Sequence, residues 1–228
     1  MKIKWGMFIT DGVGKIGGHV VQRNHYGPFA RTLVVPANPQ SAFQQDRRGQ
    51  FEYLTQNWRA LSDTRRTLWS VDSLNYPLTD PLGNTYFATG INHYISLNLN
   101  LWLIGQAFLV VPAVKRIPAD PGTFSGIIKA DGSQGKLIFD IAPTDAASQI
   151  VVYGTNGMSP GIYYVSSKYR SLTNVTPDGV TVSFNIGTAY YNLFPTPVID
   201  TKAWLKILPI DTASGCPGLP ASVSVIIT

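Results

Sequence analysis

The spacing of apolar residues changes twice along the chain, and each change predicts a change of structure. Between residues 16 and 26 apolar and polar residues mix in a strand-like way among closely spaced glycines, and Gly27-Pro28 is expected to turn the chain. From Phe43 onward apolar residues recur at intervals of three and four, which is the period of one helix face. After Pro112 short apolar runs alternate with turn residues, which is typical of β-strands.

Three helices are expected between residues 41 and 105. One face of the first carries the apolar residues Phe43, Phe51, Leu54, Trp58 and Leu61. Ser62 is expected to cap the second helix and Thr89 the third, because a hydroxyl can accept from the amides of the following turn. Gly105 is expected to end the third helix. Some of its three asparagines are expected to form hydrogen bonds to neighbouring backbone: Asn92, Asn98 and Asn100.

Two tryptophans mark the corner between the first two helices. Trp58 and Trp69 lie on apolar faces and are expected to pack together, with Arg65 or Arg66 stacked on an indole ring. For both tryptophans, a place in the hydrophobic core is favoured over a ligand-binding role.

About seven short strands are expected between residues 117 and 228, separated by turn signals such as Asp131-Gly132 and Asp178-Gly179. The strand segments are 124–129, 136–141, 149–153, 162–166, 180–186, 204–210 and 222–227. This spacing predicts an antiparallel immunoglobulin- or fibronectin-like sandwich. Tyr190 and Tyr191 are expected to close one of its corners through a phenolic hydrogen bond.

The predicted fold is therefore mainly β with a small α region. Residues 1–40 form an N-terminal extended assembly arm, residues 41–116 a small helical region with short helices, and residues 117–228 the C-terminal immunoglobulin-like sandwich. The prolines of the stretch 112–121 favour a linker between the last two parts.

Charge is sparse and unevenly placed. Charged residues make up 14% of the 228 residues, against a usual fraction of about a quarter. Low charge favours a surface covered by neighbours, although an all-β domain rich in Thr, Ser and Asn has little charge as well. The net charge of +5 comes from residues 1–72, which hold ten Lys and Arg against five acids. An acidic protein surface is favoured as their partner over nucleic acid, because the arginines are scattered and form no basic block.

Neither a membrane span nor a secretion signal is expected. The most apolar stretch, residues 97–114, is interrupted by polar residues and Pro112, whereas a span needs about twenty apolar residues. The first residues lack the apolar core and cleavage site of a signal peptide, so synthesis in a cytoplasm is expected. The lone Cys216 excludes an intrachain disulfide and is interpreted as a passive loop thiol.

No catalytic, cofactor or metal site is predicted, and the chain is not expected to be an enzyme. His19 and His25 lie six residues apart without an acidic cluster, and His93 lies on a predicted helix. Residues 12–17 match the letters of the Gly-x-Gly-x-x-Gly dinucleotide pattern, but no βαβ unit surrounds them.

A recognisable order of residues runs through the first 105 positions. It comprises Gly14-Lys-Ile-Gly-Gly-His-Val-Val-Gln-Arg-Asn24, Gly27, Arg31, Gln44, Gln45, Arg48, Trp58-Arg-Ala-Leu-Ser-Asp-Thr-Arg-Arg-Thr-Leu-Trp69, Gly83, Gly90 and Asn98. This order resembles a group of uncharacterised tailed-phage proteins that look like virion structural proteins; the β half resembles them in architecture alone. The resemblance implies a non-enzymatic component of a phage particle and brings no activity with it.

We therefore expect a bacteriophage virion structural protein that docks through its arm. The residues expected to bind the partner are Lys15, Gly17, Gly18, Gln22, Arg23 and Arg31. Expected partners are other virion proteins (capsid, neck or tail subunits), in a homo-oligomer or another symmetric assembly. A capsid decoration or minor capsid protein is favoured, with a neck or tail component (a head-to-tail connector) next. Nucleic acid and membrane are disfavoured as partners.

The rival interpretation is a carbohydrate- or surface-binding module. Its sugars would stack on tyrosines of the β half: Tyr153, Tyr163, Tyr164, Tyr169, Tyr190 and Tyr191. Binding of glycans by residues 117–228 alone would favour this alternative, whereas binding that requires the arm would favour docking.

Overall fold

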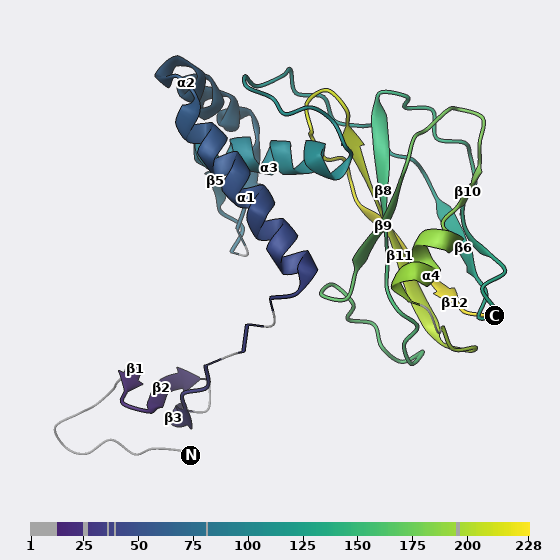
Figure 1. The fold of residues 1–228 in the computed structure, drawn as a ribbon, viewed down its shortest axis with the longest axis horizontal. Coiled ribbons are helices and arrows are strands. Elements are labelled where there is room, and N and C mark those ends of the chain that lie inside the picture. Colours follow the sequence, from purple (N-terminus) through teal and green to yellow (C-terminus); the bar gives the residue numbers. More distant parts are fainter. Residues whose placement is uncertain (1–12, 25–26, 36, 39, 81, 195–196) are drawn as a thin grey trace. The chain divides into compact units, whose positions relative to one another are not determined.

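The computed structural model describes residues 13–24, 27–35, 37–38, 40–80, 82–194 and 197–228. Over these residues the chain forms twelve strands in four antiparallel sheets and four α-helices, so the expectation of a mainly β protein with a small α region is confirmed (Figure 1). The chain divides into two compact units, Met1–Asp46 and Arg47–Thr228.

The first unit contains a small antiparallel sheet in the order β1-β2-β3. Its strands are β1 (Gly14–Ile16), β2 (His19–Asn24) and β3 (Gly27–Thr32). The arm therefore folds back on itself here and does not run as one extended segment. Gly27 and Pro28 pair with Asn24 and Arg23 inside the sheet, so the turn expected at Gly27-Pro28 is wrong. Residues 25–26, which connect β2 to β3, lie outside the described residues.

The second unit begins with the helices, whose predicted capping residues are confirmed. They are α1 (Ala42–Ala60, whose first residues belong to the first unit), α2 (Asp63–Asp72), a 3-10 turn (Ser73–Asn75) and α3 (Gly90–Leu103). Ser62 Oγ accepts from the amide of Arg65, and Thr89 Oγ1 from that of Asn92, each at 3.4 Å. A short hairpin of β4 (Pro77–Thr79) and β5 (Thr85–Phe87) separates α2 from α3.

Gly105 ends α3 as expected, and its backbone explains why. Its φ is +71°, a left-handed conformation that costs glycine little. The amide of Gly105 donates to Trp102 O at 3.0 Å and that of Gln106 to Leu101 O at 2.9 Å, which is the hydrogen-bond pair of a Schellman motif. Two carbonyls at the end of the helix are thereby satisfied.

In the helical core a tyrosine packs against the two tryptophans that were expected to pack together. Tyr94 of α3 packs against both indoles, with ring centroids 5.4 Å from Trp58 and 5.2 Å from Trp69. Both tryptophans are part of the core, but Trp69 is fully buried and Trp58 only half-buried. Arg66 donates to Trp58 O at 3.3 Å and to Arg59 O at 2.7 Å, so it caps the end of α1. The cation–π contacts of the described residues involve lysines and neither Arg65 nor Arg66, so the expected stacking on an indole is wrong.

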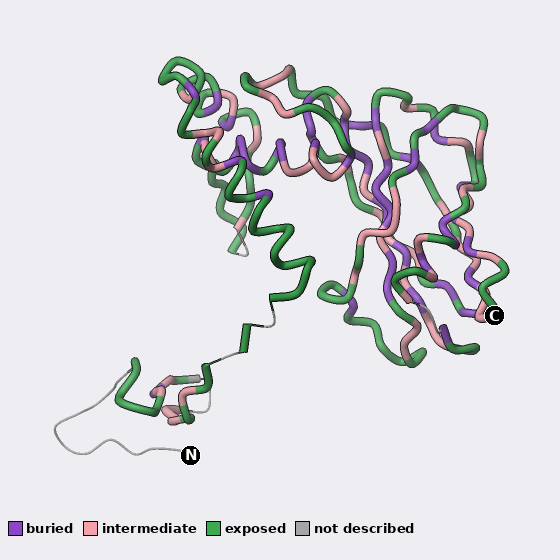
Figure 2. The backbone as a smooth tube through the Cα atoms, in the orientation of Figure 1, coloured by how far each residue is buried: buried purple, intermediate pink, exposed green. Residues whose placement is uncertain are grey.

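Two sheets form the β half and share one hydrophobic core. The strands are β6 (Phe124–Ile128), β7 (Gly135–Phe139), β8 (Ser148–Gly154), β9 (Arg170–Val175), β10 (Ser183–Asn185), β11 (Lys202–Asp211) and β12 (Ala221–Ile226). Their orders are β10-β7-β6 and β12-β11-β8-β9. Leu137 of the first sheet and Val152 and Leu205 of the second are fully buried in the same cluster. Figure 2 shows buried stretches of backbone in the β half.

Six of the seven expected strands are confirmed, and one is wrong. Residues 162–166 form no strand, and the aromatic rings that suggested one are exposed: Tyr163 by 72% and Tyr164 by 78%. The seventh strand is β9, whose sequence Arg-Ser-Leu-Thr-Asn-Val is too polar to give a strand signal.

A short helix, α4 (Gly187–Leu193), carries the two tyrosines that were expected to close a corner. Tyr190 donates its hydroxyl to Thr155 O at 3.0 Å, and Tyr191 donates to Lys129 O at 2.8 Å. The expected phenolic bonds are therefore confirmed. Each ring ties α4 to a loop at the end of a strand.

The helices and the second sheet share a further hydrophobic cluster. Leu101 and Ile104, at the end of α3, pack with Val151 of β8 and Ile210 of β11. As expected, a helix asparagine bonds to neighbouring backbone, because Asn98 Nδ2 donates to Tyr94 O at 2.9 Å. Asn100 Nδ2 donates to the distant Gly215 O, also at 2.9 Å. The predicted domain boundaries after residues 40 and 116 stay predictions. The end of α3 covers part of the outer surface of the second sheet.

Candidate functional site

The six residues expected to bind a partner all lie in the arm sheet (β1–β3). Gly17 and Gly18 form the two-residue connection between Ile16 and His19, which pair with each other. Gly17 has a φ of +55° and Gly18 no positive φ, the combination found in a type II′ hairpin turn. A side chain at Gly17 would be strained, whereas Gly18 has open space around it and an ordinary backbone angle.

The pairing register divides the four remaining residues between the two faces of the sheet. Residues directly opposite on antiparallel strands point to the same face, and successive residues point to opposite faces. Lys15 and Arg31 both pair with Val20, so all three share one face, which we call the arm face. Gln22, two residues after Val20, lies on the arm face as well. Arg23 lies on the opposite face, so the structure separates it from the others.

The arm face has an apolar centre between two cations. Val20 and Phe29 are half-buried, whereas Lys15 and Arg31 are exposed. The two cations flank Val20 from the neighbouring strands, roughly 10 Å apart. An arrangement of this kind fits a partner that offers an apolar contact with acidic or carbonyl groups on either side.

The arm buries little of its own apolar surface. Among the described residues 13–35, Val21 is the one buried hydrophobic side chain. Four hydrophobic side chains there are exposed: Val13, Ile16, Val34 and Val35. A small sheet with so slight a core gains stability when a partner covers these side chains.

Among the pockets of the second unit, one lies beside a histidine. It has a volume of about 450 Å³ and lies between α3 and the β4–β5 hairpin, with the rings of Tyr76, Tyr86 and Phe87 in its wall. His93 also lines it, with Nε2 2.9 Å from Asp72 Oδ2, as in a carboxylate-oriented imidazole. Among the described residues, no hydroxyl or thiol forms a hydrogen bond with His93, so the nucleophile of a triad is missing.

The free thiol near this pocket is not set up for chemistry. Cys216 is buried, and burial raises its pKa, whereas a reactive cysteine needs a lowered pKa. It therefore fits its interpretation as a passive loop thiol. Burial likewise raises the pKa of the neighbouring Tyr76, helped by Cys216 and Asp72.

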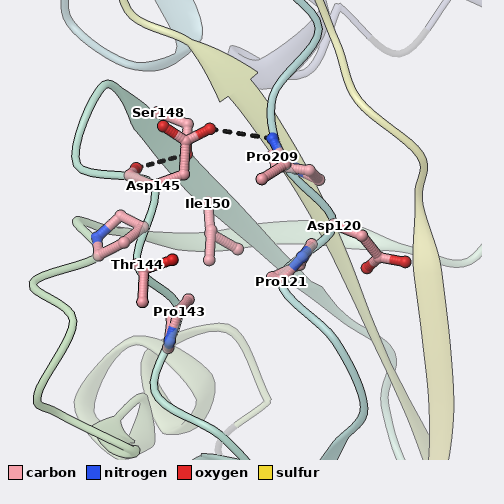
Figure 3. Close-up of a pocket in the computed structure, with 10 residues that line it drawn as sticks. Asp120, Pro121, Pro143, Thr144, Asp145, Ser148, Ile150 and Pro209 are labelled. Carbon is pink, nitrogen blue, oxygen red and sulfur yellow. Dashed lines mark hydrogen bonds between the residues drawn. The ribbon is translucent and has the colours of Figure 1, made fainter.

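A much smaller hollow lies beside β8, and Figure 3 shows the residues that line it. Its volume of about 20 Å³ leaves room for little more than one water molecule. Asp145, in its wall, already accepts from the amide of Ala119 at 2.9 Å and is paired with Arg116. The backbone carbonyl of Asp145 accepts from Ser148 Oγ at 2.9 Å.

Arg116, Asp145 and Asp211 form a cluster of two ion pairs that no local sequence pattern indicates. Arg116 lies in the expected linker, and its guanidinium bridges Asp145 and Asp211, 29 and 95 residues further along the chain. Such a contact has no local pattern, because it depends on the tertiary fold.

No protein-family model matches the chain, and no curated protein matches it in sequence. The described residues contain no group of three or more His, Cys, Asp or Glu side chains placed to hold a metal ion. Of the described helices, none combines the length and apolar character needed to cross a bilayer.

Proposed function

We propose that this chain is a non-enzymatic structural protein of a tailed-phage virion and that it docks onto a neighbouring virion protein through its arm. The observation that carries this proposal is the arm itself. Residues 1–46 form a unit of their own, whose small sheet has one buried hydrophobic side chain among its described residues and an arm face with two exposed cations. The resemblance of residues 10–105 to phage virion proteins points the same way.

The mechanism is burial of the arm face against the partner. Val20 and Phe29 lose their contact with water, and Lys15 and Arg31 meet acidic or carbonyl groups at the rim. The arm's exposed apolar residues add further area, and its edge strands can extend a neighbour's sheet. The positive φ of Gly17 shapes the turn that keeps β1 in register with β2 and so places Lys15 on the arm face.

For the C-terminal half we propose an immunoglobulin- or fibronectin-like sandwich. The strand order supports this finer assignment. If β6 to β12 are lettered A, B, C, C′, E, F and G, the two sheets read E-B-A and G-F-C-C′. This is the division of strands in immunoglobulin-type sandwiches when the strand after C stays beside it.

Within the particle, a capsid-surface decoration or minor capsid protein is the favoured role. A sandwich with polar outer strands suits an exposed surface, and an arm suits attachment to a lattice of identical neighbours. A neck or tail component comes next, because an arm of this kind can dock in a ring as well. The proposed location is the virion, after synthesis in the host cytoplasm, and the proposed assembly is symmetric.

Deleting residues 1–35 tests the docking mechanism. The deletion removes the arm sheet and leaves the second unit complete. The second unit should therefore melt at the same temperature in the truncated protein as in the full chain, and its circular dichroism signal should be unchanged. It should be absent from purified particles when supplied in place of the full chain. Normal incorporation of the truncated protein would show that the arm is not the anchor, and unfolding of the whole chain would show that it belongs to the core.

A further inference from the structure

The outer surface of the sheet β12-β11-β8-β9 is covered along only part of its length. The end that holds Val151 and Ile210 lies under α3. Toward the other end, β11 presents Lys202, Trp204 and Lys206, alternating with residues that point into the core. We call this part, with the residues paired to it, the lysine face.

Two lysines on this face are held against aromatic rings. The ammonium of Lys202 lies 4.7 Å from the ring centre of Tyr163 and 4.8 Å from that of Trp204. That of Lys206 lies 5.7 Å from the ring centre of Tyr169. Cation–π contacts of this kind hold the ammonium groups in place without neutralising their charge. Less side-chain freedom is then lost when an anion binds.

The strands of this part of the sheet carry no acidic side chain, and the exposed Asp200 lies in the turn before β11. Asp211, the one acid in the sheet's four strands, lies at the far end of β11, where it is bound to Arg116. Among the described residues, neither Lys202 nor Lys206 forms an ion pair. Lysines that are positioned but unneutralised favour an anionic ligand.

Hydroxyl groups surround the lysines. Trp204 pairs with Ser224 and Lys206 with Ser222 on β12, and both serines are exposed. On the other side Lys206 pairs with Tyr153 of β8. Aromatic rings that can stack on sugar rings, beside hydroxyls that can exchange hydrogen bonds with sugar hydroxyls, form a surface suited to a carbohydrate.

From this combination we propose that the lysine face binds an acidic polysaccharide with carboxylates on some of its sugars. Lys202 and Lys206 are four residues apart on one strand, roughly 13 Å. Two cations that far apart, with hydroxyls between them, match sparse carboxylates better than a nucleic acid, whose every nucleotide carries a phosphate. Of the six tyrosines named in the rival interpretation, Tyr190 is buried in the core around α4 and Tyr191 packs against it, so neither belongs to the lysine face.

Titration calorimetry of the full chain with three uronic acid oligosaccharides tests the proposal: hyaluronan, polygalacturonate and polymannuronate. At least one should bind, more weakly as salt is added, and neutral dextran should not. The Lys202→Gln/Lys206→Gln variant should bind that oligosaccharide with a Kd raised by about tenfold or more, because each lysine contributes a charge-assisted contact that the variant lacks. Tyr163→Ala, a change at an exposed ring, should weaken binding as well.

The matched control is Lys129→Gln/Lys136→Gln, which removes two lysines from β6–β7 and the adjoining loop of the other sheet. It should leave the Kd unchanged. Binding of none of the three oligosaccharides, or equal losses in the control and the lysine-face variant, would overturn the proposal. So would tighter binding of an oligothymidylate that depends on the same two lysines, because the face would then be a nucleic-acid site. None of these results bears on docking through the arm, which requires particles.

Discussion

Asp211 shows how one buried carboxylate joins distant parts of the chain. Its side chain is 1% exposed, and it accepts from Arg116 Nη1, from Ser214 N and from Ser214 Oγ, each at 2.7 Å. Burial alone would raise the pKa of Asp211, but the bonds from Ser214 and Arg116 outweigh it and lower the pKa below the ordinary 3.8. A lowered pKa in the folded state means that this carboxylate stabilises the fold above pH 3.8 and loses its contribution as the pH falls through the folded value.

Replacing Asp211 with Asn should therefore cost stability and flatten the acid dependence. We expect a loss on the order of 2 kcal/mol at pH 7, under the usual range for breaking a buried pair because Arg116 is half-exposed. Below pH 4 the difference between variant and wild type should shrink. Urea unfolding between pH 2 and 7 measures both. Asp63→Asn, at an exposed pair with Arg66, serves as the control and should cost under about 1 kcal/mol; an Asp211 variant no worse than this control would contradict the account.

The two tryptophans of the helical core should differ in their cost. Trp69 is fully buried and donates its indole N–H to Val110 O at 3.2 Å, whereas Trp58 is half-buried. Trp69→Ala should lower the free energy of unfolding by about 3–5 kcal/mol, and Trp58→Ala by about 1–2 kcal/mol, since less apolar surface is uncovered. Chemical unfolding of both variants checks the order. Equal losses of unfolding free energy in the two variants would show that Trp58 contributes as much to the core as Trp69 does.

The arm sheet depends on one turn. A β-branched residue at Gly17 would have to adopt a φ of +55°, which costs about 1–2 kcal/mol, whereas Gly18 has no such requirement. Gly17→Val should therefore disturb the β1–β2 register and weaken incorporation into particles, while Gly18→Ser should incorporate normally. The second unit should melt at the same temperature in both variants. If Gly17→Val entered particles as well as the wild type, docking would not depend on the geometry of this turn.

Helices and strands with a strong pattern in their own sequence could be predicted. Those that form only because a neighbouring strand pairs with them could not. The helix limits followed from periodicity and from the caps at Ser62, Thr89 and Gly105, all of which depend on residues within a few positions. The polar strand β9 became a strand because β8 offered it an edge, and no local pattern reports that. Residues 162–166 had the composition of a strand but had no partner to pair with among the described residues.

The candidate site was predictable in part. The glycines and basic residues of the arm could be singled out from the sequence, because their spacing is local. Their division into faces could not, since it depends on the two-residue turn at Gly17-Gly18 and on the register that it sets. The lysine face combines Tyr163 from a loop, Lys202 from β11 and Ser222 from β12, which meet only after folding.

At the scale of the whole molecule, the predicted boundary at residue 117 between the helical region and the sandwich can be tested with fragments. A fragment 117–228 lacks Leu101 and Ile104, which cover part of the sheet, and also Arg116, which neutralises the buried Asp211. We expect it to be markedly less stable than a fragment 41–228, which keeps both. Thermal unfolding of the two fragments, followed by circular dichroism, measures this. Equal melting temperatures would show that the sandwich stands alone and that the helical contacts are dispensable.

Quantitative mass spectrometry of purified phage particles tests the central claim most directly. The proposed function requires the chain to be a stoichiometric component that stays with the particle through gradient purification and a salt wash. A copy number in the hundreds is predicted for a capsid decoration, and one ring of subunits for the alternative role in the neck or tail. Absence from purified particles, with the chain abundant in the infected-cell lysate, would contradict the account.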